Sequence, residues 1–116
     1  GIYNDGTNLY PGTLLKDFVT VSVGATGVVA ASATQQLTKG IYWFVVLPEA
    51  NCSIERLNSQ WGILGQIATD FGATTENVHW YVSQAYGALP DPFTAGGTLQ
   101  VGERQLAILG RLLTLD

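Results

Sequence analysis

Turn-forming residues interrupt this chain so often that long helices are not expected in it. The sequence contains 14 glycines and 4 prolines, and the segments between them are short, apolar and rich in β-branched or aromatic side chains. Such segments, separated by turns at intervals of roughly ten residues, are typical of strands in all-β proteins. The pattern therefore predicts an all-β fold, an antiparallel β-sandwich of jelly-roll type with about eight short strands.

Two segments give the clearest strand predictions. Residues 16–23 place Val19, Val21 and Val23 on one face of a strand, and we expect this face to point toward the core. Residues 41–47 are apolar on both faces, which predicts a central strand buried on both sides, with Trp43 in the core.

The remaining segments follow the same pattern. Asn, Asp, Gly and Pro predict turns over residues 4–8 and 9–12. Residues 89–93 contain two prolines, which lack ladder donors, so they cannot form a central strand. Further strands or extended segments are expected over residues 1–3, 28–36, 52–57, 78–85, 99–101 and 105–113, with residues 61–71 irregular or strand.

The length of 116 residues fits a single domain, so we expect one β-sandwich domain over residues 1–116. The chain starts with Gly1-Ile2-Tyr3, which is already strand-like and has no initiating methionine. We therefore expect a fragment of a longer polypeptide rather than a signal peptide.

Charge excludes two classes of partner. The net charge is −4, charged residues make up 12% of the chain, and the five lysines and arginines are scattered. No basic stripe exists to neutralise phosphates, so nucleic acid and anionic membrane surfaces are not expected partners. The longest apolar run, residues 41–48, is too short to span a bilayer, so membrane insertion is not expected.

The residue types that carry most chemistry are scarce. One cysteine, Cys52, and one histidine, His79, cannot form a zinc site or an internal disulfide, and no metal or cofactor is expected. No serine lies in a Gly-x-Ser-x-Gly elbow, and nothing in the sequence selects a catalytic pair from the nine carboxylates. The prediction is a protein that is not an enzyme, with hydrolysis of glycans left as a minor alternative.

Aromatic residues beside polar ones are the remaining candidates for a binding site. Flat rings can stack on the apolar faces of sugars while amides and carboxylates bind the hydroxyl groups. The alternative is that the rings fill the core or a subunit interface, where Trp and Tyr are also enriched. The candidate glycan-binding residues are Trp61, Trp80, Tyr86, His79 and Asp91.

Three stretches in order resemble a family. They are residues 1–6 (GIYNDG) with 10–17 (YPGTLLKD), residues 37–45 (LTKGIYWFV), and residues 85–90 (AYGALP) with Phe93. Together they resemble a β-sandwich domain of tail-fibre, spike and minor virion structural proteins of tailed bacteriophages.

The resemblance implies a virion protein that attaches to host-surface polysaccharide or scaffolds a fibre, with other virion subunits as partners and a homotrimer as the usual assembly. The shared positions are structural, so it assigns no binding residues. The alternatives are a pure assembly or capsid-decoration module without a ligand, and a glycan-degrading spike domain. The apolar run over residues 106–115 would form an exposed edge, so we expect a subunit contact to cover it.

Overall fold

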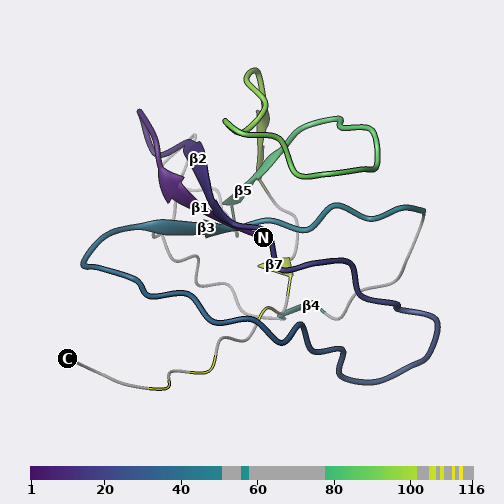
Figure 1. Ribbon diagram of the computed structural model, residues 1–116. Coiled ribbons are helices and arrows are strands. Elements are labelled where there is room, and N and C mark those ends of the chain that lie inside the picture. Colours follow the sequence, from purple (N-terminus) through teal and green to yellow (C-terminus); the bar gives the residue numbers. More distant parts are fainter. Residues whose placement is uncertain are drawn as a thin grey trace. The chain divides into compact units, whose positions relative to one another are not determined.

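All regular structure in the described part of the chain is β. The computed structural model describes residues 1–50, 56–57, 78–101, 105–106, 108, 111 and 113 (Figure 1). These residues contain seven strands, all in antiparallel pairs, and no helix. The all-β prediction is confirmed at this level.

The chain divides into two compact units, which we describe one at a time. The first unit comprises Gly1–Cys52 and Val82–Gly97, and the second comprises Ser53–Tyr81 and Thr98–Asp116. The prediction of a single domain over residues 1–116 stays a prediction.

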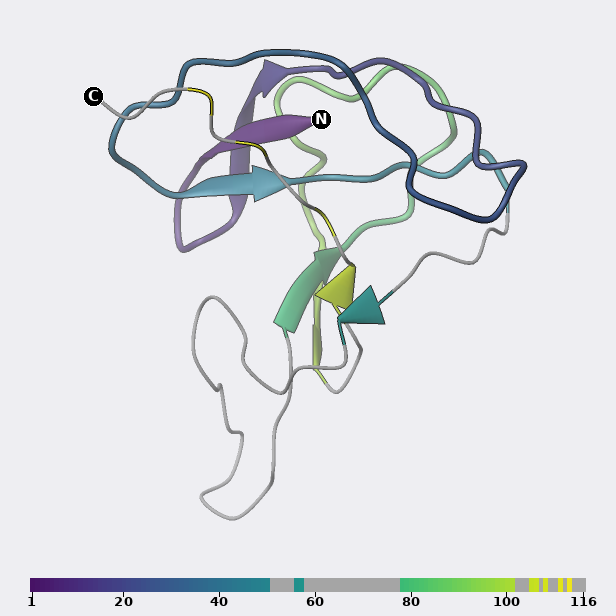
Figure 2. The ribbon, with the colours of Figure 1, turned by 90° about the horizontal axis from the view of Figure 1, so that it is seen from below.

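The first unit is built on a three-stranded antiparallel sheet (Figure 2). β1 (Ile2–Asp5) lies between β2 (Pro11–Lys16) and β3 (Tyr42–Phe44), in the order β2-β1-β3. In this register Ile2 is opposite Lys16 on one side and Phe44 on the other. The first few residues of the chain therefore form the centre of the sheet.

The turn from β1 to β2 is set by two glycines that face each other. The backbone N–H of Gly6 donates to the carbonyl of Tyr10 at 2.8 Å. A Cβ on Gly6 would lie 2.8 Å from that carbonyl oxygen, and one on Gly12 would lie 3.0 Å from the Cα of Gly6. The turn predicted over residues 9–12 is wrong in its position: Pro11 starts β2, because proline is tolerated at the first residue of a strand.

The core of the first unit forms around Tyr3. Ile2 and Tyr3 are fully buried, and the ring of Tyr3 meets that of Phe93 edge-on at 5.3 Å between centroids. Tyr10 contacts the same Phe93 ring at 5.5 Å. The Tyr3 hydroxyl donates to the carbonyl of Pro90 at 2.7 Å. A segment about ninety residues away in sequence thus closes the core over β1.

The same segment covers the outer edge of β2. The N–H of Phe93 donates to the carbonyl of Gly12 at 2.9 Å, and the N–H of Leu14 donates to Oδ1 of Asp91 at 3.0 Å. Pro90 and Pro92 have no N–H, so this segment is no regular strand, as expected. A side-chain carboxylate replaces the carbonyl that a regular ladder would supply.

The strand predicted over residues 16–23 is wrong, because β2 ends at Lys16. The edge of β2 is already covered by residues 91–93, and β1 is paired on both sides, so no free neighbour is left there. Val19, Val21 and Val23 are exposed rather than buried, with Val19 73% exposed. The chain instead leaves the sheet in a long loop (Figure 1).

The prediction of a central strand over residues 41–47 is also wrong. β3 covers only Tyr42–Phe44 and lies at the edge of its sheet, and Phe44 and Val46 are 48% and 44% exposed. Trp43 is half-buried, and its Nε1 donates to Oδ1 of Asp5 at 2.8 Å. The short apolar strand at the start of the chain takes the central place.

The second unit contains two short strand pairs. β5 (Val78–Tyr81) pairs with β6 (Thr98–Val101), and β4 (Arg56–Leu57) pairs with β7 (Gln105–Leu106). The strand predicted over residues 78–85 therefore ends at Tyr81. Residues 61–71 and Cys52 lie outside the described residues.

Replacement of Gly6 by alanine should destabilise the protein, because the new Cβ would press on the carbonyl oxygen of Tyr10 at 2.8 Å. Overpacking against backbone typically costs about 1–3 kcal/mol of unfolding free energy. Urea denaturation followed by tryptophan fluorescence measures the loss. Gly24→Ala is the control, since the nearest atom to its Cβ would be the Ser22 hydroxyl at 3.7 Å. Equal stability of the two variants would contradict this account of the turn.

The phenol of Tyr3 should ionise at a higher pH than an ordinary tyrosine side chain. Burial, followed by the negative charges of Asp17 and Asp91, raises the pKa of Tyr3 to about 12. Because this pKa lies above the ordinary value of about 10, the contribution of Tyr3 to stability is full below about pH 10 and is lost as the pH rises to about 12. Alkaline titration of tyrosinate absorbance should show one late step, which Tyr3→Phe removes. A titration without a late step would contradict burial of the hydroxyl.

Candidate functional site

The five candidate glycan-binding residues do not form one described group. Trp61 lies outside the described residues. Tyr86 and Asp91 belong to the first unit, and His79 and Trp80 belong to the second. The structure therefore gives the geometry of two separate pairs.

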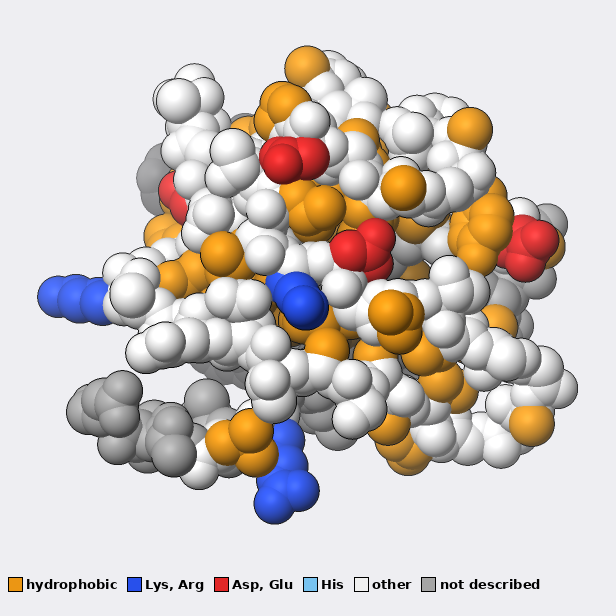
Figure 3. Space-filling model, in the orientation of Figure 1, with side chains coloured by type: hydrophobic (Ala, Val, Ile, Leu, Met, Phe, Trp, Pro, Cys, Tyr) orange, Lys and Arg blue, Asp and Glu red, His pale blue; other side chains and the backbone are white. Residues whose placement is uncertain are grey.

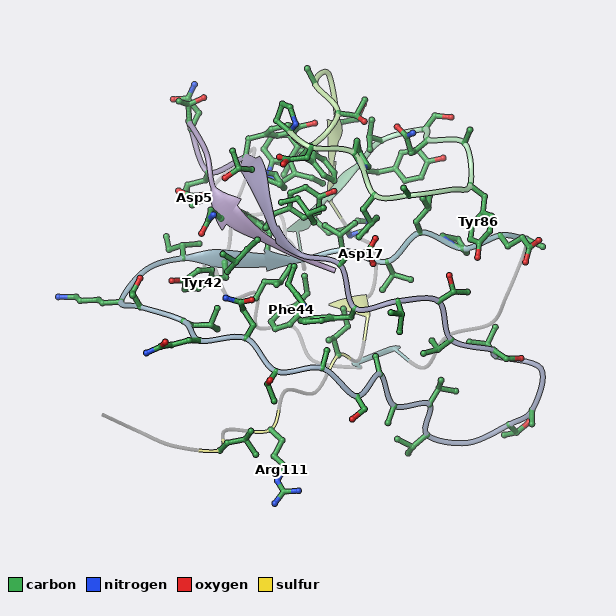
Figure 4. All side chains as sticks on the ribbon, viewed as in Figure 1. Asp5, Asp17, Tyr42, Phe44, Tyr86 and Arg111 are labelled. Atoms are coloured by element: carbon green, nitrogen blue, oxygen red, sulfur yellow. The ribbon has the colours of Figure 1, made fainter. Side chains whose placement is uncertain are left out.

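Tyr86 lies on the loop that residues 82–97 form in the first unit (Figure 4). Its side chain is 44% exposed, and its hydroxyl donates to Oγ1 of Thr20 at a long 3.5 Å. On the same loop, Oγ1 of Thr94 donates to Oε1 of Gln84 at 2.8 Å. An exposed tyrosine ring with a hydroxyl group close to its own has the chemical character that sugar stacking requires.

Asp91 has a structural role that the sequence did not suggest. Its carboxylate accepts the N–H of Leu14, which would otherwise be unpaired on the outer edge of β2. The side chain is exposed, so its other oxygen can still meet solvent or a ligand. Loss of glycan binding after replacement of Asp91 would thus have two causes that cannot be separated. One is the loss of a contact with the glycan, and the other is a change at the outer edge of β2.

His79 and Trp80 lie on opposite faces of β5. Successive side chains of a strand point to opposite sides, so these two neighbours cannot line the same face. Both are half-buried. Nδ1 of His79 is buried and has no hydrogen-bond partner within the described part of the chain.

Tyr81 is an exposed ring that the sequence analysis missed. It lies two residues after His79, on the same face of β5, and is 57% exposed. Thr98 of β6 is directly opposite Tyr81 and is exposed too. Strand alternation places Tyr81 on the same face as His79 and opposite Trp80, so the sequence could have grouped Tyr81 with His79.

Asp5 and Trp43 form a carboxylate–indole pair within the sheet of the first unit, with 2.8 Å between Oδ1 and Nε1. The bond joins β1 to β3 across their shared edge. It satisfies the indole N–H, which half-buried tryptophan generally requires. Its place between two paired strands indicates a stabilising role rather than a binding one.

The described residues contain no group of three or more His, Cys, Asp or Glu side chains placed to hold a metal ion. Within the same residues, no helix is long and apolar enough to cross a membrane. The surface seen in Figure 3 has several hydrophobic patches and few, widely separated charged side chains.

Comparisons with protein-family models, with curated proteins and with solved structures found no match for this chain.

Replacement of Asp91 by alanine should lower the unfolding free energy by about 0.5–1.5 kcal/mol, because the Leu14 N–H loses its acceptor. Glu49→Ala is the matched control, since it removes the same charge from an exposed carboxylate that makes no observed hydrogen bond to another described residue. Tyr86→Ala should also stay within about 0.5 kcal/mol of the parent. Urea denaturation of the three variants checks this. If the Asp91 variant were as stable as the Glu49 variant, the hydrogen bond from Leu14 would make no contribution to stability.

Proposed function

We propose that this chain is a virion structural domain of a tailed bacteriophage, of the tail-fibre or spike type, that attaches to host-surface polysaccharide as a homotrimer. The proposal includes an antiparallel β-sandwich of jelly-roll type with about eight strands, of which the described strand pairs are parts. Other virion subunits are its expected neighbours, and the virion is its location.

The observation that carries the proposal is the meeting of the three resembling stretches in one unit. The first stretch supplies the central strand with Tyr3, and its continuation supplies Tyr10 and β2. The second supplies β3, which pairs with β1. The third supplies Phe93, whose ring contacts both tyrosines. Sequence features that share a structural role in this way support common ancestry better than isolated turn motifs do.

Two exposed rings support a glycan as ligand. Tyr81 and Tyr86 lie in different units, and each has polar neighbours: Thr98 is opposite Tyr81, and Gln84 lies two residues before Tyr86. A tyrosine ring exposes an apolar face together with a polar hydroxyl, which suits sugar rings. The low share of charged residues favours a neutral or weakly charged polysaccharide over a phosphate-rich ligand.

An assembly module without a ligand is the second candidate. The exposed valines of residues 19–29 and the exposed side chains of Phe44 and Val46 favour it. Apolar side chains gathered at a surface generally mark a contact with another protein. This reading keeps the virion role and removes only the polysaccharide.

Binding to an array of bacterial surface polysaccharides tests the glycan part. We expect Tyr81→Ala or Tyr86→Ala to weaken retention by about 2- to 12-fold, the equivalent of losing one ring contact of about 0.5–1.5 kcal/mol. Val28→Ala, at a side chain that is 97% exposed, should bind like the parent. Near-ultraviolet circular dichroism shows whether each variant keeps its aromatic core. A folded parent that binds none of the polysaccharides would favour the assembly module.

A further inference from the structure

The outer edge of β3 has no strand partner among the residues that the structure describes. The N–H of Asp5 donates to the carbonyl of Ile41 at 3.2 Å, and the N–H of Val45 donates to the carbonyl of Gly1 at 2.9 Å. Since backbone groups alternate along a strand, those of Tyr42, Phe44 and Val46 point away from β1. No described residue makes a backbone hydrogen bond to Phe44 or Val46 on that side.

This edge lacks the usual protection of free edges. Natural edge strands carry charges, prolines or bulges that prevent pairing with another chain. Residues 41–47 contain no charged residue, proline or glycine. The next proline after them is Pro48. Phe44 and Val46 are exposed beside it (Figure 4, which labels Phe44). An edge of this kind is suited to accept another strand.

The same chain contains a strand-forming segment that pairs with no strand of the described part of the chain. Residues 18–23, FVTVSV, consist of β-branched, aromatic and small polar residues without charge. Apart from the turn-like bond from the N–H of Val19 to Oδ1 of Asp17 at 3.1 Å, no backbone hydrogen bond is observed for them within the described residues. Val19 has a φ of 77°, which is strained for a β-branched residue. Pairing as a strand would remove that strain.

Chain length prevents the first residues of this segment from pairing with the edge of their own molecule. Lys16, Ile2 and Phe44 lie in one row across the sheet, and residue 18 follows Lys16 by two positions. A strand added outside β3 would lie three strand spacings from Lys16. That distance is about 14 Å even in a straight line through the sheet. Two extended residues span at most about 7 Å. Pairing along all of residues 18–23 therefore requires another copy.

We infer that residues 18–23 of a second copy of this chain pair with the outer edge of β3 and add a fourth strand to the sheet. The inference deepens the proposed function, since it assigns an interface to the proposed oligomer. The donor and acceptor are different surfaces, so the contact is head-to-tail, and repeated contacts of this kind close into a ring when the rotation fits. Three copies make a ring that matches the proposed trimer.

Residues 30–36, AASATQQ, are a weaker candidate for the same edge, although they precede β3 by a short turn. They are rich in alanine and glutamine, which have low strand propensity. They are also exposed, and none of them forms a backbone hydrogen bond with β3 in the described residues.

Disulfide trapping between two differently tagged chains tests the contact. Both chains carry Cys52→Ser; one also carries Val21→Cys and the other Phe44→Cys, so that only pairing between molecules can join them. We expect a mixed disulfide, because directly paired strand residues have Cβ atoms about 5 Å apart. Val19→Cys and Val23→Cys cover a register shifted by two residues. Val28→Cys, outside the donor segment, should give no product with the Phe44 variant.

Two outcomes would overturn the inference. In one, none of the donor variants joins the Phe44→Cys chain, which would mean that the edge is free or is covered by its own chain. In the other, the Phe44→Cys chain joins mainly to itself, which would mean that two β3 edges pair directly about a two-fold axis.

Light scattering gives an independent readout on the full chain. The parent should have three times the mass of one chain. Val21→Lys and Phe44→Lys should be monomers, because a lysine at the paired edge blocks strand addition. Val28→Lys should remain a trimer, and near-ultraviolet circular dichroism should show a native aromatic core in all of them. A monomeric parent, or a trimeric Val21→Lys variant, would overturn the inference.

The failure of this inference can be distinguished from the failure of the proposed function. Trapping and mass report on the strand contact and do not depend on any polysaccharide. A trimer joined through Val21 and Phe44 that binds no polysaccharide would leave the inference intact and remove the glycan part. Polysaccharide binding by a monomeric parent would overturn the inference together with the proposed trimer and leave the glycan part intact.

Discussion

The edge-on contact of Phe93 with Tyr3 and Tyr10 is the constraint on which the first unit depends. It joins the central strand to a segment about ninety residues later in the sequence. The hydrogen bond from the Tyr3 hydroxyl to the carbonyl of Pro90 holds that segment against β1. Once Phe93 is in place, its backbone N–H meets Gly12 and the neighbouring Asp91 meets Leu14. The aromatic cluster and the covered sheet edge are thus linked, because Phe93 contributes its ring to the one and its backbone N–H to the other.

The sequence predicted the class of structure better than the place of each strand. Turn residues and β-branched segments are local signals, so the all-β class and the strand at residues 1–3 followed from them. The order of strands depends on which segment pairs with which, and a local pattern cannot contain that information. The run at 41–47 has the stronger apolar signal, yet Ile2 and Tyr3 are buried in its place, because only they have a neighbour on both sides.

The candidate site shows the same division between residue type and position. The sequence nominated aromatic residues beside polar ones, and of these Tyr86 is exposed. Strand alternation over residues 79–81 places His79 and Trp80 on opposite faces of β5. It places Tyr81 on the same face as His79. The role of Asp91 depends on a hydrogen bond to Leu14, 77 positions away, and no spacing rule could have predicted it.

The wrong strand predictions at residues 16–23 and 41–47 have a common physical origin. Both segments have the composition of paired strands, and among the described residues neither has the strand partners that this composition predicts. A sequence selected to be paired retains β-branched residues and excludes charge, whether its partner belongs to the same chain or to another. Strand signals that a single chain does not satisfy are therefore evidence about assembly. The short distance from Lys16 to Phe18 decides which kind of partner is sterically possible, since a strand cannot cross its own sheet to reach the far edge.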